Sequence, residues 1–270
     1  MNENKNVSNT PDYDEGMALF NGGDHDGAVK CFMRGAEKGE PCCQNALGVC
    51  YAEGTGVEQD YNKAFELCKK AADRGNAKGQ QSVGDCYFHG HGVAQDYEKS
   101  FEWSKKAAAQ GNALGQHRIG YCYYFGYGVP QDYNKAFEWF EKAAAQGFTR
   151  SMYYLACCYF DGLGVPTDRA EGFKRFEQLA VTGHKNSQFY VGYAYFFGLG
   201  VVQDYALAEP WFNRAAEQGH ADAMYFIGIM NYNGYGVEKN VDAAKQWFVK
   251  AAELGSKDAE VVLKQYYGNN

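Results

Sequence analysis

The segment YYFGYGVPQDYNKAFEWFEKAAAQG, residues 123–147, returns in variant form four more times, in stretches that end at Gly75, Gly111, Gly219 and Gly255. The register is constant at 36 residues. It is carried by Gly54, Gly90, Gly126, Gly162, Gly198 and Gly234, each followed by x-Gly-Val. A period of about 20 to 50 residues indicates a solenoid of stacked units. The sequence therefore predicts one repeat domain over residues 11–270.

Each unit contains the pattern of two helices. In the fourth unit, helix A is predicted over Ala113–Phe125 and helix B over Tyr133–Gln146, with Gly147 ending helix B. Asp132 is the expected N-cap of helix B. Its counterparts are Asp60, Asp96, Asp168, Asp204 and Asn240. Glycine inside a helix costs about 1 kcal/mol relative to alanine. The recurrence of glycine in helix A, at Gly48, Gly84, Gly120, Gly192 and Gly228, therefore predicts close approach of a second helix.

The two ends of the chain extend the same scheme. Thr10 followed by Pro11 predicts a helix N-terminus, and the first helix pair is expected over Asp12–Phe20 and Ala28–Lys38. Residues 256–267 predict a lone capping helix, with Leu263 and Tyr267 at core positions. Residues 1–10 are polar and predicted to be disordered, with neither a secretory signal nor a membrane anchor.

Composition narrows the classes of function. Hydrophobic residues make up 46% and aromatic residues 16% of the chain, which favours a folded protein. The net charge of −7 disfavours nucleic acid and anionic membranes as partners. No run approaches the roughly 18 apolar residues that span a bilayer, so no membrane insertion and a cytoplasmic location are predicted.

The cysteines follow the repeat. Cys50, Cys86, Cys122 and Cys158 are 36 residues apart, and Ala194 and Met230 occupy the next two equivalent positions. A position shared by Cys, Ala and Met is a small apolar core site. Reduced, structural thiols are therefore favoured over disulfides.

The repeated unit follows the pattern A-x3-LG-x2-Y-x2-G-x-GV-x2-D-x2-KA-x2-W-x2-KAA-x2-G. Residues 223–255 follow it well, and residues 115–147 follow it with glycine for the first alanine. This pattern resembles the Sel1-like repeat, a relative of the tetratricopeptide repeat. The resemblance implies an all-α solenoid, a right-handed superhelix of antiparallel helix pairs with the A helices on the concave side. It also implies an adaptor or scaffold role in protein complexes. The units run over 40–75, 76–111, 112–147, 148–183, 184–219 and 220–255, preceded by a tetratricopeptide-like unit at 11–39 and followed by the capping helix.

The fifth unit departs most from the pattern. It has Ala156, Arg169, Gly172, Arg175 and Leu179 where the other units favour Gly, Tyr, Ala, Trp and Ala. Drift compensated by local repacking is one interpretation. The alternative is a local change in curvature, or a second contact surface around Arg169, Lys174 and Arg175.

Signatures of catalysis are missing from the sequence. It contains no Gly-x-Ser-x-Gly, His-Glu-x-x-His or Gly-x4-Gly-Lys. Some cysteine-rich relatives carry a β-lactamase label, but no serine here has lysine three residues later, so that enzymatic alternative is disfavoured. His89-Gly-His91 is the nearest approach to a metal motif and lacks a third ligand nearby. No catalytic residue, cofactor or metal is predicted.

Function is then expected at the positions that the repeat leaves free. By the resemblance, the concave face takes the residues six before, three before, one after, four after and five after the helix A glycine. Three of these series, the residues three before, one after and four after the glycine, become aromatic along the chain. The predicted partner-binding residues are His117, Tyr121, Tyr124, Phe125, Tyr153, Phe160, Phe189, Tyr193, Phe196, Phe197, Tyr225 and Tyr232. The groove is expected to hold an extended peptide or helix of a protein partner.

Two alternatives stay open for this face. The same rings could stack on a glycan or a small molecule. The ring four after the glycine, as at Phe88, could instead pack on the neighbouring A helix in every unit. The sequence does not give the partner or the oligomeric state, although a monomer is favoured.

Overall fold

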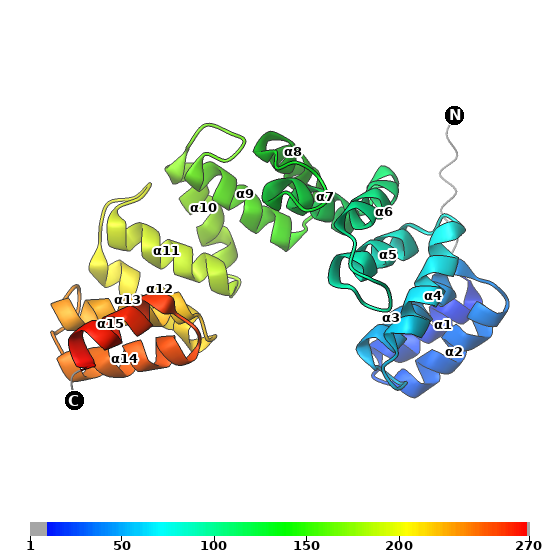
Figure 1. Cartoon of the computed structure of the whole chain (residues 1–270), viewed down its shortest axis with the longest axis horizontal. Coiled ribbons are helices and arrows are strands. Elements are labelled where there is room, and N and C mark those ends of the chain that lie inside the picture. The colour runs from blue at the N-terminus through cyan, green and yellow to red at the C-terminus, as the bar shows by residue number, and fades with distance from the viewer. Residues whose placement is uncertain (1–9, 269–270) are drawn as a thin grey trace. The chain divides into compact units, whose positions relative to one another are not determined.

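The computed structural model describes residues 10–268, which form fifteen α-helices and no strand within that range (Figure 1). The predicted disorder of residues 1–9 falls outside the described residues. The chain divides into two compact units, residues 1–148 and 149–270. Each of these two parts is hereafter called a unit, and a single helix pair is called a repeat.

Helices alternate between two roles, and consecutive helices pack on one another within each unit. Odd-numbered helices are the A helices and even-numbered helices are the B helices. The first unit contains α1 (Pro11–Asn21), α2 (His25–Glu37), α3 (Pro41–Glu53), α4 (Tyr61–Asp73), α5 (Ala77–His89), α6 (Tyr97–Ala109), α7 (Ala113–Phe125) and α8 (Tyr133–Ala144). The second contains α9 (Thr149–Asp161), α10 (Arg169–Ala180), α11 (Lys185–Phe197), α12 (Tyr205–Glu217), α13 (Ala221–Asn233), α14 (Val241–Glu253) and α15 (Lys257–Tyr267).

The predicted helix boundaries hold to within a few residues. Helix α7 has the predicted bounds, whereas α8 ends two residues before the predicted Gln146. Helix α2 begins at His25 instead of Ala28, because Asp24 caps it by accepting a hydrogen bond from the Gly27 N–H. The glycine that follows α8, Gly147, has a φ of 80°, the left-handed conformation expected of it.

The predicted N-caps of the B helices are confirmed. Asp132 Oδ1 accepts the backbone N–H of Lys135 at 3.0 Å, and Asp60, Asp96, Asp168, Asp204 and Asn240 cap their own helices in the same way. Such a cap satisfies a backbone donor that the first helical turn leaves without a partner. The caps therefore fix the point at which each loop becomes helix B.

Helix A glycines make room for helix B, as predicted. A Cβ added at Gly120 would lie 2.7 Å from the ring of Phe140, and one at Gly192 would lie 2.8 Å from the ring of Phe212. Both rings are fully buried. At Gly84 the facing residue is Ser104, whose hydroxyl would lie 3.1 Å from the added Cβ. The glycine is therefore needed most where helix B presents a large ring.

Glutamine side chains at the ends of B helices join successive repeats. Gln110 Nε2 donates to the Gly75 carbonyl at 2.9 Å and to Gln80 Oε1 at 2.8 Å, one repeat back. Gln218 repeats this arrangement in the second unit, with Gly183 and Gln188 as its acceptors. This polar ladder runs beside the apolar core and fixes the register of neighbouring repeats.

All nine cysteines are buried and unpaired in the structure. Burial raises the pKa of the Cys122 thiol to about 12, so the thiol is protonated at neutral pH. The periodic cysteines are core residues, as predicted.

Local repacking accommodates the fifth repeat. Ala156 replaces the helix A glycine and is fully buried, while Gly172 on the facing helix leaves room for the backbone of Phe160, 2.8 Å from where a Cβ would lie. Arg175 stands over the ring of Tyr159 at 4.8 Å and pairs with Glu171 at 2.7 Å. Arg169 and Lys174 are exposed.

Candidate functional site

Three of the rings four after the helix A glycine lie in the core. Phe88, Phe160 and Phe196 are 9%, 3% and 6% exposed. Phe196 contacts Phe226 of the next A helix at 5.3 Å between ring centroids, and Phe160 contacts Tyr190 of its next A helix at 6.1 Å. The predicted surface positions of Phe160 and Phe196 are therefore corrected, because each ring packs on the neighbouring A helix.

The residues three before the glycine are also partly withdrawn from solvent. His117 is 5% exposed, and its ring lies 5.7 Å from the ring of Phe140 and 5.0 Å from that of Phe148. It therefore offers little surface to a partner. Tyr153 is half-buried, and burial raises the pKa of its hydroxyl. Half-buried Tyr225 contacts Phe248 at 5.8 Å.

Helix α11 carries a stripe of three predicted residues, spaced four apart on one helical face: Phe189, Tyr193 and Phe197. This set is called the α11 stripe. Neighbours along it are 5.8 and 4.6 Å apart between ring centroids. Phe226 of α13 lies 6.0, 5.6 and 5.8 Å from the three rings in turn. Phe189 and Tyr193 are half-buried and Phe197 is 46% exposed, so the stripe becomes more exposed toward its C-terminal end.

The first unit has a related patch on α7. Phe125 is 42% exposed and lies 4.6 Å from Tyr121 and 4.8 Å from Tyr124, both of which are half-buried. At the far end of the second unit, half-buried Tyr232 lies under the Lys239 ammonium at 5.8 Å. The structure thus places the predicted residues in separate local clusters.

Sequence reasoning missed the residue two before the helix A glycine. Phe226 stacks on Phe212 at 5.2 Å and 9°, and Tyr190 stacks on Phe176 at 4.5 Å and 9°. Arg118, the equivalent residue in the first unit, lies over the Phe88 ring at 4.1 Å. The signal was present in the sequence, because this position changes from Ala46 and Ser82 to large side chains from Arg118 onward.

Histidines border the aromatic surface of the second unit. His184 Nδ1 and His220 Nδ1 accept backbone N–H groups at the starts of α11 and α13, both at 3.3 Å. The His220 ring also stacks on Phe189 at 4.4 Å. Burial lowers the pKa of both imidazoles, so at neutral pH they are uncharged acceptors.

Two groups of side chains could be considered for a cation. His89 and His91 stack at 5.4 Å, and Tyr61 stacks on His91 at 4.3 Å, so these rings pack on one another at an exposed loop. Glu40, Cys42 and Cys43 bring three donor atoms within 4.8 Å of one another. Cys43 donates its S–H to Glu40 at 3.2 Å, and burial raises the pKa of this thiol to about 12. The Thr10 hydroxyl makes a hydrogen bond to each of the three side chains, so all three donor groups already have partners within the protein.

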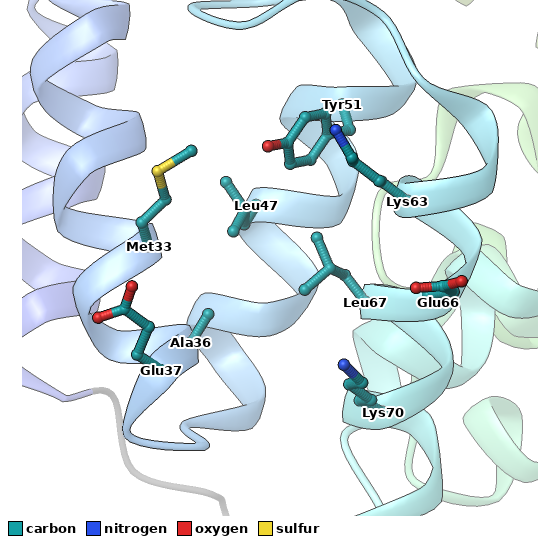
Figure 2. Close-up of a pocket in the computed structure, with 9 residues that line it drawn as sticks. All are labelled: Met33, Ala36, Glu37, Leu47, Tyr51, Lys63, Glu66, Leu67 and Lys70. Carbon is teal, nitrogen blue, oxygen red and sulfur yellow. The ribbon is translucent and has the colours of Figure 1, made fainter.

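A pocket of about 370 Å³ opens between α2, α3 and α4 (Figure 2). Leu47 and Leu67 converge on its floor, with the Tyr51 ring at one end and Lys70 at the other. Its remaining lining residues are Met33, Ala36, Glu37, Lys63 and Glu66. None of the predicted partner-binding residues lines it.

Comparison with known proteins agrees with the repeat geometry. The family model for the Sel1 repeat matches residues 43–76, 77–112, 113–148, 149–180, 185–220 and 221–256. No curated protein matches the chain. None of the described helices has the length and apolar character needed to cross a membrane.

Two solved structures are similar over most of the chain. A Sel1 repeat protein from Oxalobacter formigenes is 27% identical, with a TM-score of 0.81, over 90% of this chain and 97% of its own. The protein c5321, a protective antigen of uropathogenic Escherichia coli, is 34% identical with a TM-score of 0.75. That match covers 95% of this chain, which spans only 57% of the antigen's length.

Repeats of this type commonly mediate protein–protein interactions and generally form non-catalytic scaffolds. The six matched segments cover most of the sequence and coincide with the helix pairs. The chain therefore belongs to the Sel1 repeat family.

Proposed function

We propose that the protein is an adaptor whose second unit binds a segment of a protein partner on the face formed by its A helices. The proposal rests on the α11 stripe, in which rings at a regular spacing of four residues run from the half-buried Phe189 to the exposed Phe197. Membership in a family whose repeats commonly bind proteins supports the same function.

The chemistry of the stripe suits a peptide or helix with apolar side chains. Phe197 and Tyr193 are already held by ring contacts to Phe226, so little side-chain entropy is lost when a partner covers them. Aromatic residues held in this way are typical anchors of protein interfaces. An amphipathic helix could align apolar residues along the stripe with the same spacing of four.

The proposal is tested by replacing Tyr193 and Phe197 with alanine together. Affinity capture from the native cell, quantified by mass spectrometry, should lose its specific partner, with at least a tenfold drop in recovery. Leu207→Ala is the matched control, since Leu207 is 47% exposed but lies on α12. Recovery should be unchanged in this control. Full recovery with the double variant would overturn the proposal.

Glycan binding by the same rings is the competing outcome. A glycan array on the purified protein distinguishes it, because specific glycan signals that vanish in the Tyr193→Ala, Phe197→Ala variant would replace the protein-partner assignment. Circular dichroism of that variant checks that helicity is retained in either case.

A further inference from the structure

The pocket in Figure 2 lies at a position of the repeat that four other repeats fill with a tryptophan side chain. Leu67 on α4 is equivalent, at multiples of 36 residues, to Trp103, Trp139, Trp211 and Trp247. In the one remaining repeat the position is Arg175, which stands over the Tyr159 ring. The α4 repeat alone among the six has a short aliphatic side chain at this position.

In the other repeats the indole fills a defined space. Trp139 packs against a core cluster that includes Phe101 and Ala108 of the preceding B helix and Ile119 of its own A helix. A cation three residues later covers each indole. The ring centroids lie 3.8 Å from Lys106, 4.2 Å from Lys142, 4.5 Å from Arg214 and 4.6 Å from Lys250. The indole is therefore held between an apolar floor and a cation.

The α4 repeat keeps the walls of this space. Ala36 and Leu47 occupy the positions of Ala108 and Ile119, and Lys70 occupies the position of Lys142. In Figure 2 the Lys70 side chain borders the pocket floor formed by Leu47 and Leu67. The pocket thus has the floor and the cation of an indole site, with the indole missing.

The charges around the pocket cancel. The lining residues include two acidic side chains, Glu37 and Glu66, and two basic ones, Lys63 and Lys70, so their formal charges sum to zero. A rim without net charge gives no electrostatic preference for a charged indole metabolite, whereas an uncharged side chain on a polypeptide enters without an unpaired charge. Tryptophan is also among the side chains most often found as anchors in central pockets of protein interfaces.

We propose that this pocket, which we call the Leu67 pocket, binds a tryptophan side chain of a partner protein. The incoming indole takes the place that Trp103 and its equivalents fill from within the chain, between Leu47 and the Lys70 ammonium. The pocket lies on the side of the B helices α2 and α4, so this contact is separate from the α11 stripe and does not depend on it.

The test uses the full chain with methyl-labelled methionine and N-acetyl-tryptophanamide as the probe. Titration should shift the Met33 methyl signal by ring currents, because Met33 lines the pocket. N-acetyl-leucinamide should leave this signal in place. A glycine-flanked tryptophan peptide should bind at least as well as the amide, and the same peptide with phenylalanine at least threefold more weakly.

Two variants check that the site is the one proposed. Leu67→Trp should fill the pocket, raise the melting temperature and weaken probe binding at least tenfold; Leu67→Phe is the fallback if that variant misfolds, with a smaller loss. Trp139→Leu should open an equivalent pocket between α6 and α8, and equilibrium dialysis should then count two bound probes per chain.

The proposal is overturned by any of three results. These are a Met33 signal that does not move at saturating probe, probe binding that survives Leu67→Trp, and equal affinity for the tryptophan and phenylalanine peptides.

Discussion

The same three positions of helix A carry different chemistry in the two units. Between α5 and α7, Arg118 contacts Asp85 Oδ1 at 2.5 and 3.1 Å and lies over Phe88, and Gln81 donates to Asp85. Between α11 and α13, the equivalent positions hold Phe189, Tyr193 and Phe226, and the contacts are ring to ring. An ion pair in one unit is replaced by an aromatic cluster in the other.

The backbone does not dictate the chemistry of this face. The helices have equal length and the same caps at Gly90 and Gly198, both with left-handed φ. The B-helix residue that packs behind this face differs between the two units. It is the buried Phe212 on α12 and, at the equivalent position of α6, the buried Ser104. A larger ring behind the glycine supplies a surface on which Phe226 can stack.

The largest effect should come from removing that supporting ring. Phe212→Ala leaves a cavity beneath Phe226 and Phe189 and should lower the free energy of unfolding by about 3–5 kcal/mol. Ser104→Ala is the matched change in the first unit. It loses only the hydrogen bond to the Ser100 carbonyl, at 2.8 Å, and should cost about 0.5–1.5 kcal/mol.

Urea unfolding measures both losses, and hydrogen exchange in peptides from α11–α13 places the larger one in the second unit. Comparable costs for the two variants would contradict the supporting role of Phe212.

Replacing a helix A glycine with alanine should likewise cost more stability in the second unit than in the first. Gly192→Ala places a Cβ 2.8 Å from the Phe212 ring, and such overpacking costs about 1–3 kcal/mol. Gly84→Ala places it 3.1 Å from the Ser104 hydroxyl, where a small shift suffices and the gain in helix propensity of about 1 kcal/mol offsets it. Thermal melts should show Gly192→Ala to be the more destabilising by about 1–2 kcal/mol. The reverse order would mean that ring contact does not impose the glycine.

Breaking the ion pair should have a smaller effect. Asp85→Asn keeps the shape of the side chain but removes its charge, and because Asp85 is about a third exposed the expected cost is about 1 kcal/mol. Raising the salt concentration should destabilise the wild type and leave the variant almost unchanged. Tyr193→Phe at the equivalent position of the second unit is the control, since it should alter no salt dependence. Equal salt dependence in the wild type and Asp85→Asn would argue against a stabilising ion pair.

The repeat made the scaffold predictable, and the surface was harder to predict. Constant spacing placed Asp132, Gly120 and Cys122 correctly, because one backbone solution is reused in every repeat. Phe160 and Phe196 were assigned to the surface because periodic spacing alone cannot separate a ring turned outward from one packed on the next repeat. The role of Phe226 depends on Phe212, a residue 14 positions earlier in the chain, so only their packing reveals it. Leu67 is not among the predicted residues, because it is notable only for occupying a position where four other repeats have tryptophan.

The N-caps of the A helices should give the smallest effect, one that depends on pH. The second unit uses His184 and His220 where the first uses Asn76 and Asn112. Burial lowers the pKa of both histidines, and for His220 the nearby Lys185 lowers it further while Asp222 opposes this.

As the pH falls below about 6.5, His184 and His220 are protonated in the unfolded chain before they are protonated in the folded one. Their contribution to the free energy of unfolding is therefore fully present above that pH and is lost as the pH falls through their folded-state pKa values. His184→Asn with His220→Asn keeps both caps and removes the titration. Hydrogen exchange in α11 and α13 at pH 7 and pH 5 should therefore show protection that falls with acid in the wild type and falls less in the double variant. The same measurement in α5 and α7 gives the reference for asparagine caps, and an identical acid response in wild type and variant would assign the loss to other groups.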